Sequence, residues 1–211
     1  MQREASSKFG FSARNTLSIA QSLYERHKLL TYPRTDSKCL PEDYISNIKS
    51  NIKGFADTIS STTLDQQIIE SSSKVIANDW IKPNKRIFND AKISDHFAII
   101  PTGKIPTTSL KEQEQKIYDL VTRRLIAIFF PYAEFETTRR ITRIDEDSFL
   151  TTGKVLVTPG YLEVYGRKPG VAAEKDEGKI YRIPHLRHID LSSGNWLILG
   201  RTKKIRNEMI E

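Results

Sequence analysis

The pattern of apolar residues changes at Pro131, and this change constrains the fold more than any other feature of the sequence. Before Pro131, apolar residues recur at intervals of three and four, as they do along one face of a helix. After it, short segments rich in Thr, Val, Ile and aromatic residues alternate with acidic or Pro-Gly turns, which is typical of β-strands. The sequence therefore predicts an α+β protein, with a helical domain over residues 1–131 and a β-rich domain over residues 132–211.

Three helices are predicted in the first domain from their end signals. One follows Ser12, which suits an N-cap; a second opens at Pro41 and can end at Gly54; the longest runs from about Glu112 to Phe130. Each has apolar positions on one face, and the expected core residues are Ala13, Leu17, Ala20, Tyr24, Ile45, Ile48, Ile52, Ile117, Leu120, Val121, Leu125 and Ile128.

Strands and loops are predicted from residue type. The expected strands cover residues 135–144, 148–158, 160–165 and 196–199. The hydroxyl-rich stretches 60–63 and 71–73 are expected to be loops, because Ser and Thr compete with the backbone for hydrogen bonds.

The composition restricts the compartment and the class of protein. The chain has 211 residues and a net charge of +7, and no apolar run approaches the roughly 18 residues of a membrane span. Its one cysteine, Cys39, excludes an internal disulfide and a zinc site built on several thiolates. Residues 1–4 lack the apolar segment of a secretory signal. We therefore expect an intracellular protein whose positive charge suits a phosphate backbone only if basic residues share one face.

The connector between the first two helices carries the run Tyr-Pro-Arg-Thr-Asp-Ser over residues 32–37. Pro33 favours an extended Tyr32, and in an extended backbone Tyr32, Arg34 and Asp36 project to the same side. A guanidinium beside a phenol favours the phenolate and can hold a phosphate oxygen, which suits in-line attack on a phosphodiester. The alternative is a structural turn in which Tyr32 packs on a helix and Arg34 pairs with Asp36.

This run resembles the active-site region of type IA DNA topoisomerases, and its form is most similar to the bacterial topoisomerase III branch. The preceding residues 9–13 and 19–24 resemble the same region. Further matches are the histidine-containing segment Asp-His-Phe-Ala-Ile-Ile-Pro-Thr at residues 95–102 and the helix at residues 117–121, which Arg123 and Arg124 follow. The resemblance covers residues 1 to about 165.

The resemblance implies a role for four residues. Tyr32 is expected to be the nucleophile, which attacks a single-stranded phosphodiester and keeps the 5′-phosphate as a phosphotyrosine. Arg34 matches the arginine that steadies the scissile phosphate, and His96 matches a histidine that donates a hydrogen bond near it. Asp36 matches the motif aspartate, which we expect to orient His96 or Arg34. From the residues alone, His96 could instead be a buried imidazole and Asp36 a cap.

The resemblance also implies partners outside this sequence. In the family, a Toprim domain supplies a catalytic glutamate, a lysine and the acidic cluster that binds Mg²⁺, and no segment here matches it. We therefore expect an internal fragment, without a metal or cofactor site of its own, of a cytoplasmic, nucleoid-associated enzyme. That parent cleaves one strand of DNA, passes a strand through the break and religates it. The fragment alone is expected to be inactive and to bind single-stranded DNA, the remaining domains of the parent, and no membrane.

Alternative functions make different demands on the sequence. A non-catalytic module that binds single-stranded nucleic acid would keep the fold with an idle site, and this reading remains open for the isolated chain. A tyrosine recombinase is disfavoured because its nucleophile follows its arginine and histidine partners, whereas Tyr32 precedes His96. A rolling-circle relaxase would need a two-histidine metal motif, which the sequence lacks.

Overall fold

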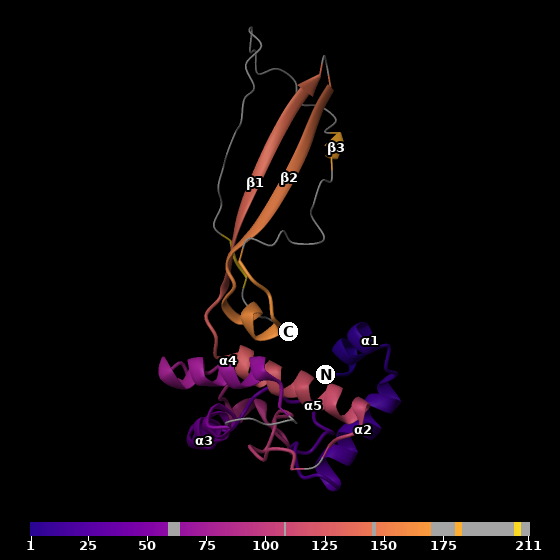
Figure 1. Ribbon diagram of the computed structural model, residues 1–211, viewed down its shortest axis with the longest axis vertical. Coiled ribbons are helices and arrows are strands. Elements are labelled where there is room, and N and C mark those ends of the chain that lie inside the picture. The colour runs from indigo at the N-terminus through magenta and orange to yellow at the C-terminus, as the bar shows by residue number, and fades with distance from the viewer. Residues whose placement is uncertain (59–63, 108, 145–146, 170–179, 183–204, 208–211) are drawn as a thin grey trace. The chain divides into compact units, whose positions relative to one another are not determined.

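A computed structural model describes residues 1–58, 64–107, 109–144, 147–169, 180–182 and 205–207 (Figure 1). The chain divides into two compact units, Met1–Phe130 and Pro131–Glu211. The described α-helices belong to the first unit and the described strands to the second, which confirms the predicted α+β class. Within these residues, no helix is long and apolar enough to cross a membrane.

The first unit is a bundle of short helices. Its described α-helices are α1 (Gln2–Phe9), α2 (Ala13–Glu25), α3 (Ile45–Ala56), α4 (Gln66–Ala77) and α5 (Glu112–Ala127). Two 3-10 helices lie between them, η1 (Glu42–Tyr44) and η2 (Asp90–Lys92). Helix α5 packs against both α2 and α4, and α4 also packs against α3. α5 therefore links the two halves of this unit.

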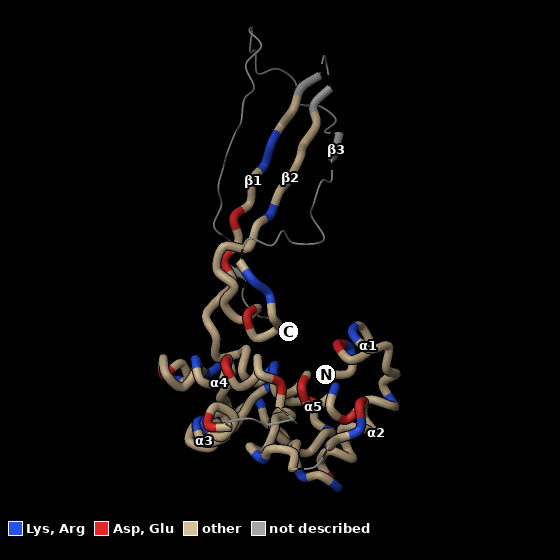
Figure 2. Tube along the Cα trace, in the orientation of Figure 1, with Lys and Arg blue, Asp and Glu red and all other residues tan. Residues whose placement is uncertain are grey.

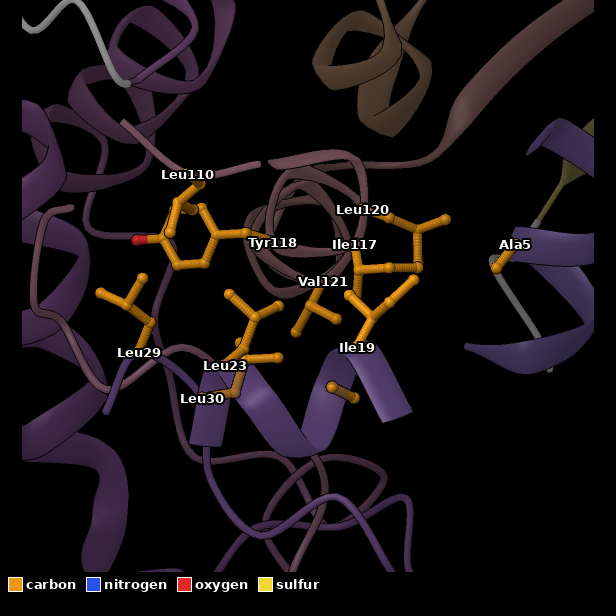
Figure 3. Packing of buried hydrophobic residues seen from close by; sticks show 11 residues of the cluster. Ala5, Ile19, Leu23, Leu29, Leu30, Leu110, Ile117, Tyr118, Leu120 and Val121 are labelled. Carbon is orange, nitrogen blue, oxygen red and sulfur yellow. The ribbon is translucent and has the colours of Figure 1, made fainter. Parts of the chain in front are cut away.

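One core cluster of the first unit lies between α5 and α2 (Figure 3). Ile117 of α5 and Leu23 of α2 are fully buried in it, and the two leucines that follow α2, Leu29 and Leu30, belong to the same cluster. Tyr118 is also buried and donates a hydrogen bond to the Lys104 carbonyl at 3.1 Å. Leu29 and Leu30 lie directly before residues 31–37, which we call the tyrosine segment, and the core therefore fixes the start of this segment.

Helix α2 begins as predicted, but its buried face overlaps the predicted one only at Ala20. Ser12 is its N-cap, and the Ser12 side chain accepts a hydrogen bond from the Asn15 N–H at 3.2 Å. The buried residues of the helix are Thr16, Ile19, Ala20 and Leu23. Thr16 can enter the core because its hydroxyl donates to the Ser12 carbonyl at 2.9 Å and so leaves no unpaired polar atom. The predicted core positions Ala13 and Tyr24 are exposed and half-buried, respectively.

Three other predictions for the helical unit were wrong in position. Residues 71–73 were expected to be a loop, but they lie inside α4, where Ser71 and Ser72 are fully buried. Their burial is consistent with the position of α4, which packs against both α3 and α5. Gly54 does not end α3, which continues to Ala56, and α5 ends at Ala127 rather than at Phe130. The stretch 60–63, also predicted as a loop, lies outside the described residues.

The second unit is built on one long antiparallel hairpin. Strand β1 (Ala133–Ile144) pairs with β2 (Asp147–Thr158), and a register irregularity falls between Glu134 and Phe135. Short strands β3 (Ile180–Arg182) and β4 (Ile205–Asn207) complete the described sheet in the order β3-β2-β1-β4. At one end of the hairpin, a small core is formed by Ala133, Phe135 and Leu156, with Tyr161 and Leu162 packed against it. The predicted strand at residues 196–199 lies outside the described part of the chain.

The predicted strand at residues 160–165 is instead a 3-10 helix, η3 (Gly160–Tyr165). Gly160 has a φ of +49°, and a Cβ atom at this position would lie 2.3 Å from the Tyr132 carbonyl oxygen. The chain turns here, and the Tyr161 N–H donates to the Pro131 carbonyl at 2.9 Å. Val and Tyr suggested a strand, but the left-handed glycine forces a turn that holds the foot of the hairpin.

Candidate active site

The tyrosine segment is paired with the histidine segment of the first unit. Leu30 and Pro101 form an antiparallel bridge. On either side of it, the Thr31 N–H donates to the Ile100 carbonyl and the Thr102 N–H donates to the Leu29 carbonyl, each at 2.9 Å. Segments that are more than sixty residues apart in the sequence therefore lie side by side.

Ala98 fixes both ends of the loop that carries the motif. The Thr31 hydroxyl donates to the Ala98 carbonyl at 3.2 Å, and the Ala98 N–H donates to the Cys39 carbonyl at 2.9 Å. Thr31 Oγ1 also accepts a hydrogen bond from the Ile100 N–H at 2.9 Å. Residues 31–39 thus leave and rejoin the same point of the histidine segment, with Pro33 buried between the two ends.

Tyr32 and His96 are brought into contact by this pairing. Their ring centroids are 4.3 Å apart, with 43° between the ring planes. Tyr32 is half-buried and His96 is exposed, so the alternative of a buried imidazole is wrong. Thr35 holds the histidine backbone, since its hydroxyl donates to the His96 carbonyl at 2.7 Å. A phenol and an imidazole therefore meet at a face that solvent reaches.

Arg34 and Asp36 are both exposed, and they contact different partners. Arg34 Nη2 donates to Gln21 Oε1 at 3.4 Å, and Asp36 Oδ1 accepts from the Ser94 hydroxyl at 3.4 Å. In the part of the chain that the structure describes, Asp36 forms no hydrogen bond with Arg34 or His96. The structural turn in which Arg34 pairs with Asp36 is therefore not the observed arrangement, and neither is the expected orientation of His96 or Arg34 by Asp36.

The polar face of α2 supplies contacts that the sequence analysis missed. The Tyr24 ring meets the Tyr32 ring edge-on, with centroids 5.4 Å apart and 82° between the planes. Lys28 Nζ lies 5.6 Å from the centroid of the Tyr24 ring. The signal was present in the spacing, because Gln21 and Tyr24 are three residues apart and share a helix face. The apolar spacing predicts a core position for Tyr24, so its contact with Tyr32 was not expected.

A buried carboxylate, Glu114, fixes the end of α2 against the start of α5. It accepts hydrogen bonds from the Ser22 hydroxyl at 2.8 Å and from the Lys111 N–H at 3.1 Å, and His27 Nε2 lies 3.3 Å away. Burial by itself raises the pKa of Glu114, but these hydrogen bonds and the nearby His27 outweigh it, so the pKa lies below its usual value. The carboxylate is therefore ionised at neutral pH and holds the helix from which the tyrosine segment departs.

Within the described residues, no group of three or more His, Cys, Asp or Glu side chains could hold a metal ion. Basic residues lie on both units rather than in one element (Figure 2). In the second unit, Arg139 and Arg140 are exposed on β1.

Comparison with known proteins gives consistent matches. A family model described as DNA topoisomerase matches residues 1–195. The DNA topoisomerase 3 of Bacillus cereus is 37% identical over 187 residues, which cover 88% of this chain and 24% of the relative. The DNA topoisomerase 3 of Bacillus subtilis is 40% identical over 178 residues (84% and 23%), and that of Bacillus licheniformis is 40% identical over 168 residues (78% and 22%). The chain spans about a quarter of the length of these relatives.

Proposed function

Because this chain belongs to the type IA family of DNA topoisomerases, we propose that it carries the tyrosine with which a longer parent enzyme cleaves one DNA strand. The contact between the Tyr32 and His96 rings, 4.3 Å apart at an exposed position, carries this proposal. It brings together two residues of separate sequence matches, at a surface that a polynucleotide can reach. The parent enzyme changes DNA topology by passing a strand through the break and religating it.

In the proposed reaction, the Tyr32 oxygen attacks the phosphorus of a single-stranded phosphodiester. A bond forms between the tyrosine oxygen and the 5′-phosphate, the bond to the 3′-oxygen breaks, and the phenol loses its proton while the leaving 3′-oxygen gains one. Arg34 binds a non-bridging phosphate oxygen, and His96 donates a hydrogen bond to the same phosphate. Attack by the 3′-hydroxyl on the phosphotyrosine reverses the step without an external energy source.

Asp36 has a different proposed role from the one its motif position suggested. Its carboxylate accepts a hydrogen bond from Ser94, two residues before His96. We propose that it steadies the histidine segment through Ser94 and acts on the imidazole only indirectly. This distribution leaves Arg34 without a carboxylate partner among the described residues.

Type IA topoisomerases use Mg²⁺, and the described residues do not fit a Mg²⁺ site. The motif carboxylate, Asp36, accepts a hydrogen bond from Ser94 and belongs to no group of three or more potential metal ligands among the described residues. We propose that a Toprim domain elsewhere in the parent holds the ion and supplies the acid that protonates the leaving 3′-oxygen. The chain by itself then binds single-stranded DNA but cleaves it weakly. The second candidate function is a non-catalytic module that binds single-stranded DNA. Weak cleavage by the isolated chain fits both candidates and does not distinguish them.

A covalent-adduct assay tests the proposal. The chain is mixed with a separately expressed Toprim domain, Mg²⁺ and an oligonucleotide labelled at its 3′ end, because the 5′-phosphate side stays on the tyrosine. We expect a labelled protein band that disappears with Tyr32→Phe and persists with Tyr132→Phe, which removes an exposed phenol oxygen from the other unit. An equal yield of adduct from Tyr32→Phe would refute the assignment of the nucleophile. Abundant adduct from the chain without the Toprim domain would refute the proposed division of labour.

A further inference from the structure

Gln21 contacts Arg34 from the polar face of α2. Its side-chain oxygen accepts from Arg34 Nη2 at 3.4 Å, and its side-chain nitrogen donates to Glu25 Oε1 at 2.9 Å. The second bond fixes the orientation of the amide, because a carboxylate can only accept. The oxygen of Gln21 is therefore turned toward the guanidinium. The hydrogen bonds run from Arg34 to Gln21 and from Gln21 to Glu25, and the last two residues lie on α2.

Two carboxylates could pair with Arg34: Glu25, which belongs to the same hydrogen-bond network, and Asp36, which is two residues away in the sequence. Both form hydrogen bonds with other groups. Glu25 is bonded to Gln21, and Asp36 accepts from Ser94. Arg34 itself is exposed, and its only hydrogen bond within the described residues goes to a neutral amide. Since a guanidinium has five N–H donors, this single bond restrains it and leaves most donors available.

We infer that Gln21 is a positioning residue that orients Arg34 toward a DNA phosphate without neutralising its charge. The inference rests on the proposed function, in which Arg34 binds the scissile phosphate. A carboxylate at position 21 would also hold the guanidinium, but it would form an ion pair that competes with the phosphate. An apolar side chain would leave the charge intact and release the side chain. The neutral amide is the residue type that meets both requirements.

The test uses two substitutions at position 21 and one matched control. Gln21→Met removes the acceptor, and Gln21→Glu replaces it with a charge. Gln66→Glu is the control, since Gln66, like Gln21, lies on a helix and donates to a glutamate four residues later, Glu70; Gln66 is exposed, whereas Gln21 is half-buried. Arg34→Ala gives the effect of losing the guanidinium altogether.

Two readouts separate the roles. The first is the mobility of the Arg34 side chain in the DNA-free chain, measured by nitrogen relaxation of its Nε–Hε group. The second is the affinity for a fluorescent oligothymidylate as a function of salt. We expect Gln21→Met to increase Arg34 mobility and to change the salt slope little. We expect Gln21→Glu to keep Arg34 ordered, to weaken binding about fivefold at low salt, and to reduce the salt slope by about 0.7, the value of one phosphate contact to a single strand. Gln66→Glu should change neither the mobility of Arg34 nor the affinity and salt slope of DNA binding.

Each outcome bears on a different statement. Unchanged Arg34 mobility in Gln21→Met overturns the positioning role, whether or not the chain binds DNA. Arg34→Ala could weaken DNA binding while Gln21→Glu binds DNA as tightly as Gln66→Glu. In that case the requirement for a neutral residue at position 21 is wrong and the proposed function stands. If Arg34→Ala leaves binding unchanged, or the wild-type chain does not bind, the proposed contact of Arg34 with phosphate fails, and the mobility measurement still decides whether Gln21 orients it.

Discussion

Replacement of Glu114 by Ala should loosen the junction between α2 and α5. The Glu114 residue is 7% exposed, and its carboxylate accepts from the Ser22 hydroxyl and the Lys111 N–H at 2.8 and 3.1 Å. A hydrogen bond to a charged group contributes about 1.5–3 kcal/mol, and water can reach part of the vacated space, so we expect a loss of about 3 kcal/mol in the free energy of unfolding. Urea unfolding followed by far-ultraviolet circular dichroism measures this loss, because the described α-helices all belong to the first unit.

The pH dependence gives a second check on the same residue. Because the folded pKa of Glu114 lies below its unfolded value, its ionisation stabilises the fold at neutral pH, and this contribution is lost as the pH falls through the folded pKa. The difference between wild type and Glu114→Ala should therefore shrink below about pH 4. Glu112→Ala is the control, since the Glu112 side chain is 81% exposed on the same turn and, among the described residues, forms an ion pair only with Lys116. Equal stability of wild type and Glu114→Ala at neutral pH would show that the carboxylate does not fasten the junction.

Two further predictions concern single backbone contacts. Gly160→Ala should destabilise the end of the hairpin near Gly160 by about 2 kcal/mol or more, because φ is +49° and the new Cβ would overlap the Tyr132 carbonyl. Amide hydrogen exchange of β1 should therefore become faster. The control is Gly153→Ala, whose Cβ meets nothing within 4 Å and should leave the exchange rate unchanged. Thr35→Val should cost about 1 kcal/mol and shift the His96 ring resonances, since it removes the hydrogen bond to the His96 carbonyl; unchanged His96 resonances would show that Thr35 does not hold the histidine.

The local elements were predictable where side-chain pattern and end signals agree. Ser12 marked the start of α2, and the apolar spacing of α5 identified its buried positions, with Ile117 fully buried. In α2 the pattern failed because a polar residue is satisfied by its own helix. Thr16 entered the core through its bond to Ser12, and this rotated the buried face of α2 away from Tyr24.

The site was predictable only as far as the motif reaches. The motif spacing singled out Tyr32, Arg34 and Asp36, and the separate match singled out His96, but which of them meet depends on pairing across more than sixty residues. Asp36 pairs with Ser94, and Arg34 pairs with Gln21. No pattern in the sequence predicts either of these two pairs. Long-range hydrogen bonds of this kind are set by how the segments dock, which residue types alone do not fix.

The anchoring of the loop at Ala98 affects how the Tyr32 and His96 rings can move. Tyr32 follows one anchor, Thr31, by a single residue, and His96 precedes Ala98 by two, so the covalent paths between the rings and the shared anchor are short. A displacement of the histidine segment would carry the phenol with the imidazole, as one body. The distance between the two rings is then set by the shared anchor and stays the same when the segment moves.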